Sequence, residues 1–116
     1  MPLYTIYHNP RCSQSRQTLE LLNERGIDPE VVDYLTAPLS TQALQTLSQK
    51  LRVSVVDMMR TKEQVFKELE LGDTGVTDDQ LLQAISQNPI LLERPIVVCG
   101  DRAVIGRPPE NVLELI

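Results

Sequence analysis

Hydrophobic residues cluster in the first part of the chain in a way that predicts a strand, a helix and a second strand. Leu3–Tyr7 and Glu30–Leu35 are short runs rich in β-branched, aromatic and leucine residues, which are typical of strands. The spacing of apolar positions between them predicts a helix over about Gln14–Arg25, with Ser13 as its N-cap and Gly26 at its end. Short connections between these elements predict a βαβ unit with parallel strands.

The middle of the chain, at about residues 38–90, is predicted to form a helical insert between the second and third strands. Leucines recur at helical spacing after Ser40, and Val55–Met59 and Glu63–Leu69 each predict a shorter helical piece. Thr77-Asp78-Asp79-Gln80 is a capping box that begins another helix. This helix should end near Gln87, because Asn88-Pro89 follows.

The C-terminal part of the chain predicts a hairpin and a last helix. Ile96–Cys99 and Arg102–Ile105 flank Gly100-Asp101, a two-residue turn signal, and Pro108-Pro109 opens the helix. The predicted fold class is therefore α/β, with a four-stranded mixed sheet flanked by helices in the thioredoxin-like arrangement. A length of 116 residues favours a single domain over residues 1–116.

Composition and charge narrow the class of function. The formal net charge of −5 argues against non-specific nucleic-acid binding, and the longest apolar runs are too short to span a membrane. Met1–Thr5 has no cationic segment followed by an apolar stretch, so we expect no secretion signal and a cytoplasmic location. Two cysteines in such a chain favour free thiols, and a single histidine leaves no cluster for a metal.

The chemistry is concentrated in the loop between the first strand and the first helix. Cys12 lies there, and unpaired N–H groups and the helix dipole at a helix start favour a thiolate or a bound oxyanion. We therefore predict that Cys12 is a reactive nucleophile with a lowered pKa rather than a buried hydrophobic residue. Cys99 ends an apolar strand, so we expect it to be structural.

Basic residues surround this cysteine in sequence. Arg11 and Arg16 lie at the helix start, where cations are unfavourable and a sequence selected for stability alone would carry Asp or Glu. Their presence indicates that an anion completes the local electrostatics, so we predict that Arg16 takes part in catalysis and that Arg11 helps to bind the substrate. His8 adds a third cation or hydrogen-bond donor near Cys12.

Three further arginines are candidates for binding an oxyanion. Arg94 and Arg107 flank the predicted hairpin, so its pairing should bring them together, and Arg60 follows an apolar helical face. Guanidinium groups suit tetrahedral oxyanions because they donate hydrogen bonds in a fixed fork. We predict that these three arginines converge on the space in front of Cys12, because an acidic chain must gather cations locally to bind a dianion.

Several segments together resemble the glutaredoxin-dependent arsenate reductase family. His8, Cys12 and Arg16 match the signature His-x3-Cys-x3-Arg, and Leu91–Val98 and Arg107–Glu110 resemble two further blocks. The resemblance covers essentially the whole chain. It implies a thioredoxin-like fold in which the residue matching Pro95 is typically cis.

The resemblance also implies roles for individual residues. Cys12 would attack arsenate to form a covalent adduct, and His8 would favour the Cys12 thiolate. Arg60, Arg94 and Arg107 would hold the arsenate and later intermediates. Glutathione as a co-substrate and glutaredoxin as a protein partner would supply the electrons that release arsenite, and no tightly bound cofactor is implied.

Three functions remain open on the sequence. The first is arsenate reduction, the second is a housekeeping thiol oxidoreductase acting on glutathionylated protein or another oxyanion, and the third is a redox-responsive regulator that binds RNA polymerase. Related regulators use a Cys-x-x-Cys pair, whereas this chain has Cys12-Ser13-Gln14-Ser15. The missing second sulfur disfavours the third function, and the first two are not distinguished.

Overall fold

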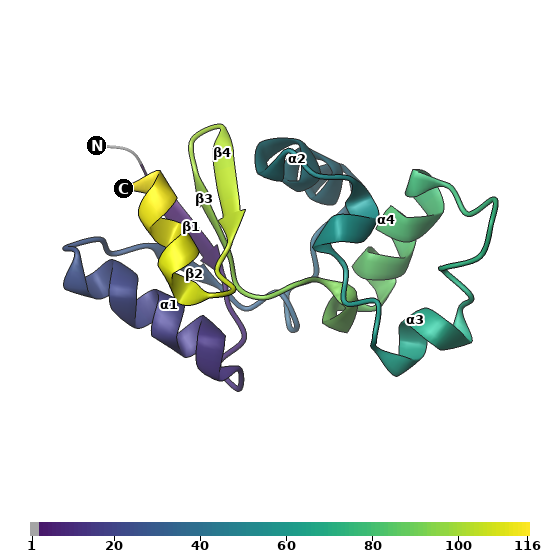
Figure 1. The fold of residues 1–116 in the computed structure, drawn as a ribbon, viewed down its shortest axis with the longest axis horizontal. Helices are drawn as coiled ribbons and strands as arrows, with labels where there is room; N and C mark the ends of the chain where they lie inside the picture. Colours follow the sequence, from purple (N-terminus) through teal and green to yellow (C-terminus); the bar gives the residue numbers. More distant parts are fainter. Residues whose placement is uncertain (1–2) are drawn as a thin grey trace. The chain divides into compact units, whose positions relative to one another are not determined.

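A computed structural model describes residues 3–116, and Figure 1 shows its fold. We predict the absence of a secretion signal from the segment Met1–Thr5. Its first two residues, Met1 and Pro2, lie outside the described residues. The chain forms two compact units, one that runs up to Ala37 and continues over Arg94–Ile116, and one over Pro38–Glu93. The second unit corresponds to the insert predicted at about residues 38–90, and the assignment of the whole chain to one domain stays a prediction.

The first unit contains the sheet. Its strands are β1 (Tyr4–Tyr7), β2 (Glu30–Val32), β3 (Ile96–Cys99) and β4 (Arg102–Ile105). They lie in the order β2-β1-β3-β4, with β1 parallel to β2 and antiparallel to β3, and β3 antiparallel to β4. These pairings confirm the predicted four-stranded mixed sheet flanked by helices.

Helix α1 (Ser13–Glu24) and the 3₁₀ helix η3 (Pro109–Leu115) pack against this sheet and against each other. Ile6 of β1 and Val97 of β3 are register partners, so their side chains lie on the same face. Both are fully buried in one cluster with Leu22 of α1 and Val112 of η3. The two helices therefore cover the same face of the sheet, and this packing fixes the start of α1 relative to the end of β1.

Two predicted strands are shorter than expected. Leu3 is 86% exposed and lies outside β1. β2 ends at Val32, because the carboxylate of Asp33 accepts a hydrogen bond from Leu35 N–H (3.1 Å) and its carbonyl accepts one from Ala37 N–H (3.0 Å). Such an Asx turn reverses the backbone direction and prevents the strand from continuing to Leu35.

The boundary of α1 differs by one residue from the prediction, and the difference matters for the chemistry. Ser13 is the first helical residue, and Cys12, with φ −92° and ψ 123°, occupies the N-cap position. The assignment of Ser13 as N-cap was therefore wrong. At the other end, Gly26 has φ +77° and donates its N–H to Asn23 O, which ends the helix as predicted.

The second unit is built from short helices around its own core. The elements are α2 (Thr41–Leu51), the 3₁₀ helix η1 (Val55–Met58), α3 (Gln64–Glu68), α4 (Asp78–Gln87) and the 3₁₀ helix η2 (Pro89–Leu91). The capping box at Thr77 is confirmed, since its side chain accepts from Gln80 N–H and the Gln80 side chain accepts from Thr77 N–H. Within residues 3–116 we find no helix long and apolar enough to cross a membrane.

Candidate active site

The loop that follows β1 is folded by its own backbone and side-chain hydrogen bonds. His8 N–H donates to Val32 O (2.8 Å), which continues the β1–β2 pairing by one residue. Asn9 then closes a tight turn, because its backbone carbonyl accepts from Cys12 N–H (3.0 Å) and its side chain accepts from Arg11 N–H (3.0 Å). This turn delivers Cys12 directly to the N-cap of α1.

The N-cap position sets the acidity of Cys12. Burial alone raises the pKa of this half-buried thiol, but the backbone N–H of Ser15, the Arg94 guanidinium and the backbone N–H of Gln14 all favour the thiolate. Their combined effect holds the pKa of Cys12 below its ordinary value. The sulfur is only half-buried at the N-cap position, so the thiolate that these donors stabilise can reach an electrophile.

Arg94 is the guanidinium that acts on Cys12, and the base of the β3–β4 hairpin positions it. Ile96 pairs with Ile105, and Gly106 N–H donates to Pro95 O (2.9 Å), which extends the pairing toward both arginines. The Arg94–Pro95 and Arg107–Pro108 peptide bonds are both cis. Arg94 and Arg107 therefore lie just beyond the same end of the paired hairpin, and Arg107 is exposed.

The Nε–H group of Arg94 is a hydrogen-bond donor that is available to a bound ligand. Its Nε–H is buried, and no hydrogen-bond acceptor for it occurs among residues 3–116. A buried donor without a partner is energetically costly, so an acceptor supplied by a bound molecule would stabilise it. An oxyanion in front of Cys12 has oxygens of the right kind for this donor.

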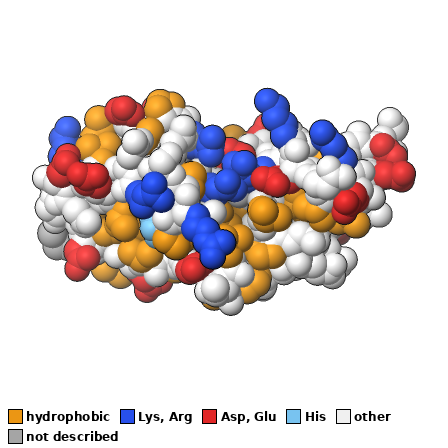
Figure 2. Space-filling view, turned by 90° about the horizontal axis from the view of Figure 1, so that it is seen from below, with side chains coloured by type: hydrophobic (Ala, Val, Ile, Leu, Met, Phe, Trp, Pro, Cys, Tyr) orange, Lys and Arg blue, Asp and Glu red, His pale blue; other side chains and the backbone are white. Residues whose placement is uncertain are grey.

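His8 is buried, and its ring contacts a serine rather than solvent. His8 Nδ1 lies 2.6 Å from Ser15 Oγ, and the same Oγ accepts from Asn9 N–H (3.1 Å). Burial lowers the pKa of His8, Asp33 opposes that effect, and Arg16 adds to it, so that the net pKa is lowered. Figure 2, in which the only histidine is pale blue, shows it recessed among hydrophobic side chains.

Arg16 and Arg11 lie at the rim of the same loop. Arg16 Nη1 donates to Pro10 O (2.8 Å), so this guanidinium ties the start of α1 back to the loop. Arg11 is exposed. Their predicted roles toward Cys12 or a substrate stay predictions.

Arg60 lies in the second unit, where it is half-buried. Its guanidinium is paired with Glu63 and Glu93, at 3.0 Å and 3.9 Å. The predicted convergence of Arg60 with Arg94 and Arg107 in front of Cys12 stays a prediction. The structure brings Arg94 to Cys12, and it places Arg107 next to Arg94 along the hairpin.

Ser15 is a candidate functional residue that our sequence analysis missed. It is fully buried, its hydroxyl contacts His8, and its N–H acts on Cys12. A small polar residue three positions after a cysteine at a helix start was the available signal, because residues three apart share a helix face. In the sequence, Ser15 stands out only as the position at which a Cys-x-x-Cys pair would have its second cysteine.

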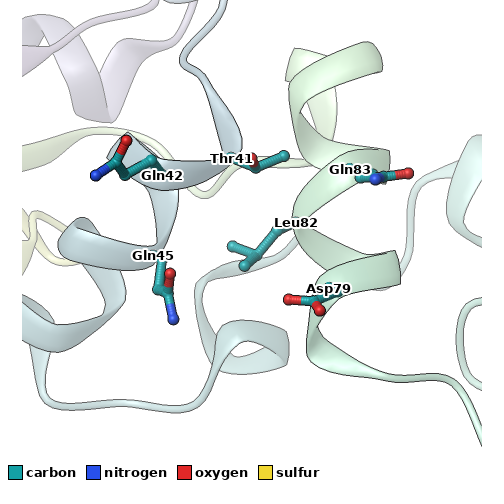
Figure 3. Close-up of a pocket in the computed structure, with 6 residues that line it drawn as sticks. All are labelled: Thr41, Gln42, Gln45, Asp79, Leu82 and Gln83. Atoms are coloured by element: carbon teal, nitrogen blue, oxygen red, sulfur yellow. The ribbon is translucent and has the colours of Figure 1, made fainter.

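The second unit also contains a small polar pocket. It has a volume of about 210 Å³ and is lined by Thr41, Gln42, Gln45, Asp79, Leu82 and Gln83. Figure 3 shows Leu82 and Asp79 of α4 pointing toward α2. None of the predicted site residues lines it. Within residues 3–116, no three His, Cys, Asp or Glu side chains are grouped to hold a metal ion.

Comparisons with known proteins agree with this arrangement. Residues 7–115 match the sequence model of the ArsC family. The chain is 52% identical to the uncharacterized protein YfgD of Escherichia coli K12 (96% of this chain, 94% of that one), and 48% identical to a Haemophilus influenzae protein named arsenate reductase (96% and 97%). Among solved structures, the arsenate reductase from Vibrio cholerae matches with a TM-score of 0.97 and 50% identity, over 99% of this chain and 98% of that one.

Proposed function

This chain belongs to the ArsC family, and from that membership we propose that it is an arsenate reductase that works through a covalent adduct on Cys12. The observation that carries the proposal is the position of Cys12 at the N-cap of α1, beside the Arg94 guanidinium. This position supplies a thiolate and an oxyanion-binding donor at one point.

In the first step, the Cys12 thiolate attacks the arsenic atom of arsenate. A sulfur–arsenic bond forms, one arsenic–oxygen bond breaks, and the departing oxygen takes up protons and leaves as water. Arg94 can stabilise the charge on the remaining oxygens, since its buried Nε–H has no acceptor within residues 3–116. His8 and Ser15 hold the loop that presents Cys12.

Reduction of arsenate to arsenite then requires two electrons. We propose that glutathione, acting as a co-substrate, attacks the arsenic atom of the adduct and displaces a second oxygen as water. A glutaredoxin thiol then attacks the glutathione sulfur, and the electron pair of the sulfur–arsenic bond stays on arsenic. The glutathione and glutaredoxin thiols end as one disulfide as As(V) becomes As(III), and water then hydrolyses the remaining bond between Cys12 sulfur and arsenic, which releases arsenite and the Cys12 thiolate. No tightly bound cofactor is needed for this sequence, and a cytoplasmic location would give access to glutathione.

The structure favours a thiol from another molecule, rather than a second cysteine of this chain, as the group that resolves the adduct on Cys12. Position 15, where a second cysteine would complete a Cys-x-x-Cys pair, holds a buried serine that is bonded to His8. Cys99 pairs with Tyr4 at the start of β1, whereas Cys12 follows the end of that strand. Both thiols are free, so a partner thiol must resolve the adduct.

The test is arsenate-dependent oxidation of NADPH in the presence of glutathione, glutaredoxin and glutathione reductase. We expect turnover with the native chain and none with Cys12→Ser. Omission of glutaredoxin or of glutathione in parallel reactions identifies the electron donor. Absence of arsenate-dependent turnover, together with Cys12-dependent reduction of a glutathionylated protein, would instead support the housekeeping thiol oxidoreductase.

A further inference from the structure

A buried side-chain oxygen without a hydrogen-bond donor lies at the start of α1. Gln14 Oε1 is buried, and no group within residues 3–116 donates a hydrogen bond to it. A buried acceptor without a donor is energetically costly, as is the buried Nε–H of Arg94 without an acceptor. The two groups do not satisfy each other, so each one needs a partner that this part of the chain does not supply.

The helix face that carries Gln14 packs against the base of the β3–β4 hairpin. Gln14 and Thr18 are four residues apart, so they share a face of α1. Thr18 Oγ1 donates to Gln14 O (2.8 Å) and lies 3.4 Å from Gly106 O. A Cβ atom at Gly106 would lie 3.0 Å from Pro95 Cγ. This face of the helix therefore adjoins the segment that begins with Arg94.

Gln14 and Arg94 also act on the same sulfur atom. The backbone N–H of Gln14 and the Arg94 guanidinium both favour the Cys12 thiolate. The long side chain of a helical residue leans toward the N-terminus of its helix, and Cys12 is the N-cap of α1. A ligand in front of Cys12 therefore meets a buried acceptor from the helix and a buried donor from the hairpin.

We propose that Gln14 is a specificity-determining residue whose side-chain oxygen accepts a hydrogen bond from a hydroxyl group of the bound oxyanion. Arg94 Nε–H donates to an unprotonated oxygen of the same ion. The inference rests on the proposed function, in which an oxyanion binds in front of Cys12. It narrows the substrate class to tetrahedral oxyanions that carry a proton.

Protonation distinguishes the oxyanions that compete for such a site. Arsenate and phosphate keep an oxygen-bound proton near neutral pH, so they can donate to Gln14 and accept from Arg94. Sulfate carries no proton under these conditions. A bound sulfate would leave Gln14 Oε1 without a donor and would place an anionic oxygen against it. Such an unpaired buried group in the complex is what rejects an ion of nearly the same shape.

Protection of Cys12 from iodoacetamide measures the binding of each anion to the native chain. At neutral pH and equal ionic strength, half-protection should need about five- to a hundredfold less phosphate than sulfate, the factor that corresponds to an unsatisfied buried acceptor. A phosphate preference below about fivefold would overturn the proposal. A preference for sulfate would overturn it too, because the Gln14 amide would then donate rather than accept.

Gln14→Met removes the side-chain oxygen and keeps the length of the side chain and the backbone N–H. The preference for phosphate should fall to within about twofold, because neither anion then meets the acceptor. Alkylation of Cys12 without added anion should stay unchanged, since the N–H that acts on the sulfur remains. A purely structural role of Gln14 would change this alkylation and leave the preference in place.

Gln17→Met is the matched control, since it makes the same substitution at an exposed position of the same helix. The preference for phosphate should be that of the native chain. A preference that persists in Gln14→Met, or that Gln17→Met abolishes equally, would overturn the proposal. Should Gln14→Met not fold, the comparison of the two anions on the native chain decides the question.

The turnover assay separates this inference from the proposed activity. If the native chain prefers phosphate, Gln14→Met loses the preference and arsenate is not turned over, the proposed function fails and the inference stands. If arsenate is turned over normally and the two anions protect Cys12 equally, the inference alone fails. Absence of protection by either anion would overturn the inference whether or not arsenate is reduced.

Discussion

At the scale of single residues, the reactivity of Cys12 depends on a balance between burial and local positive potential. Burial favours the neutral thiol, whereas two backbone N–H groups and the Arg94 guanidinium favour the thiolate, and the second effect is larger. Cys99 has no such neighbours at a helix start, because it ends strand β3 opposite Tyr4 and Arg102. The two thiols should therefore differ in reactivity despite similar exposure.

We predict that iodoacetamide alkylates Cys12 selectively in the folded protein. The rate at Cys12 should rise with pH through a midpoint below the ordinary thiol pKa of 9.0, because the folded environment lowers the pKa of this group. Mass spectrometry of the labelled peptides measures both sites, and Cys12→Ser provides the control for Cys99. Equal labelling of the two cysteines at neutral pH would remove Cys12 as the nucleophile.

We also predict that His8 tunes Cys12 through Ser15. Burial is the largest effect on His8 and lowers its pKa, so at neutral pH the ring is uncharged and acts by its hydrogen bond. His8→Ala and Ser15→Ala should each raise the pKa of Cys12, and a higher pH should restore much of the alkylation rate and of turnover. The double variant should show about the same shift as either single variant, because both break one network.

The alternative role for His8 gives a different result. A rate that stays low at high pH in His8→Ala would indicate that His8 transfers a proton in the reaction. Sequence reasoning could place His8 near Cys12, but it could not identify the contact with Ser15. That contact depends on how the turn at Asn9 folds back onto the first turn of α1.

Two measurements, arsenate use and the pKa of Cys12, should distinguish the roles of the three candidate arginines. Replacing Arg60, Arg94 or Arg107 by Ala should each weaken arsenate use by roughly tenfold to hundredfold, since a charge-assisted hydrogen bond contributes about 1.5–3 kcal/mol. Only Arg94→Ala should also raise the pKa of Cys12, because Arg94 is the guanidinium that lowers it. Lysine replacements should restore activity in part, because an ammonium lacks the planar fork.

The variant of each arginine tests the role of that arginine independently of the other two. A variant with unchanged kcat/KM for arsenate would remove that residue from the oxyanion site. If only Arg60 fails, the thiol enzyme remains and its substrate becomes the open question. Circular dichroism of each variant confirms that any loss of activity does not come from unfolding.

At the scale of elements, the sequence predicted the bounds of those helices and strands that depend on interactions between residues close together in the chain. Strands β3 and β4 have the predicted bounds, since a two-residue turn sets their register. The end of β2 was misplaced because it depends on hydrogen bonds made by Asp33 with residues that follow it. The insert is helical as predicted, and the two shorter pieces predicted at Val55–Met59 and Glu63–Leu69 are η1 and α3, of which η1 is a 3₁₀ helix.

Gly106 lies where the β3–β4 hairpin packs against helix α1. A Cβ atom at this position would lie 2.8 Å from Thr18 Oγ1 and 3.0 Å from Pro95 Cγ. Thr18 is fully buried and bonded to Gln14 O, so it has little room to move. The close approach therefore requires glycine, and it holds the base of the hairpin, which carries Arg94, against the middle of α1.

We predict that Gly106→Ala destabilises the protein by about 1–3 kcal/mol, as overpacking of a filled core does. It should also raise the pKa of Cys12, because the hairpin base that carries Arg94 must shift. Urea unfolding and alkylation against pH measure the two effects. Gly72→Ala is the control, since its nearest contact would be Phe66 Cε1 at 3.4 Å. Equal stability of the native chain and Gly106→Ala would show that this contact is not limiting.

At the scale of the whole molecule, pH acts on folding through the groups that the site perturbs. The pKa of His8 is lowered mainly by burial, and the pKa of Cys12 is lowered by N–H groups and Arg94 despite burial. Each group thus binds fewer protons in the folded state than in the unfolded state over part of the pH range. The free energy of unfolding must then rise with pH across each of those windows.

For His8, the window lies below its ordinary pKa of 6.5. As the pH falls through this value, the unfolded chain takes up a proton that the folded chain resists, so stability is lost on acidification. For Cys12, the window lies between its lowered pKa and 9.0. There the folded thiolate is favoured over the unfolded thiol, so the stabilisation is complete above 9.0 and is lost as the pH falls through the window.

We therefore predict that the free energy of unfolding of the native chain, measured with urea, increases as the pH rises through the range below 6.5 and again as the pH rises toward 9.0. His8→Ala should flatten the first rise, and Cys12→Ser should flatten the second, each leaving the other in place. A first rise that persists in His8→Ala would assign it to other groups. A native chain with constant stability across both windows would show that neither the ring of His8 nor the thiolate of Cys12 is coupled to folding.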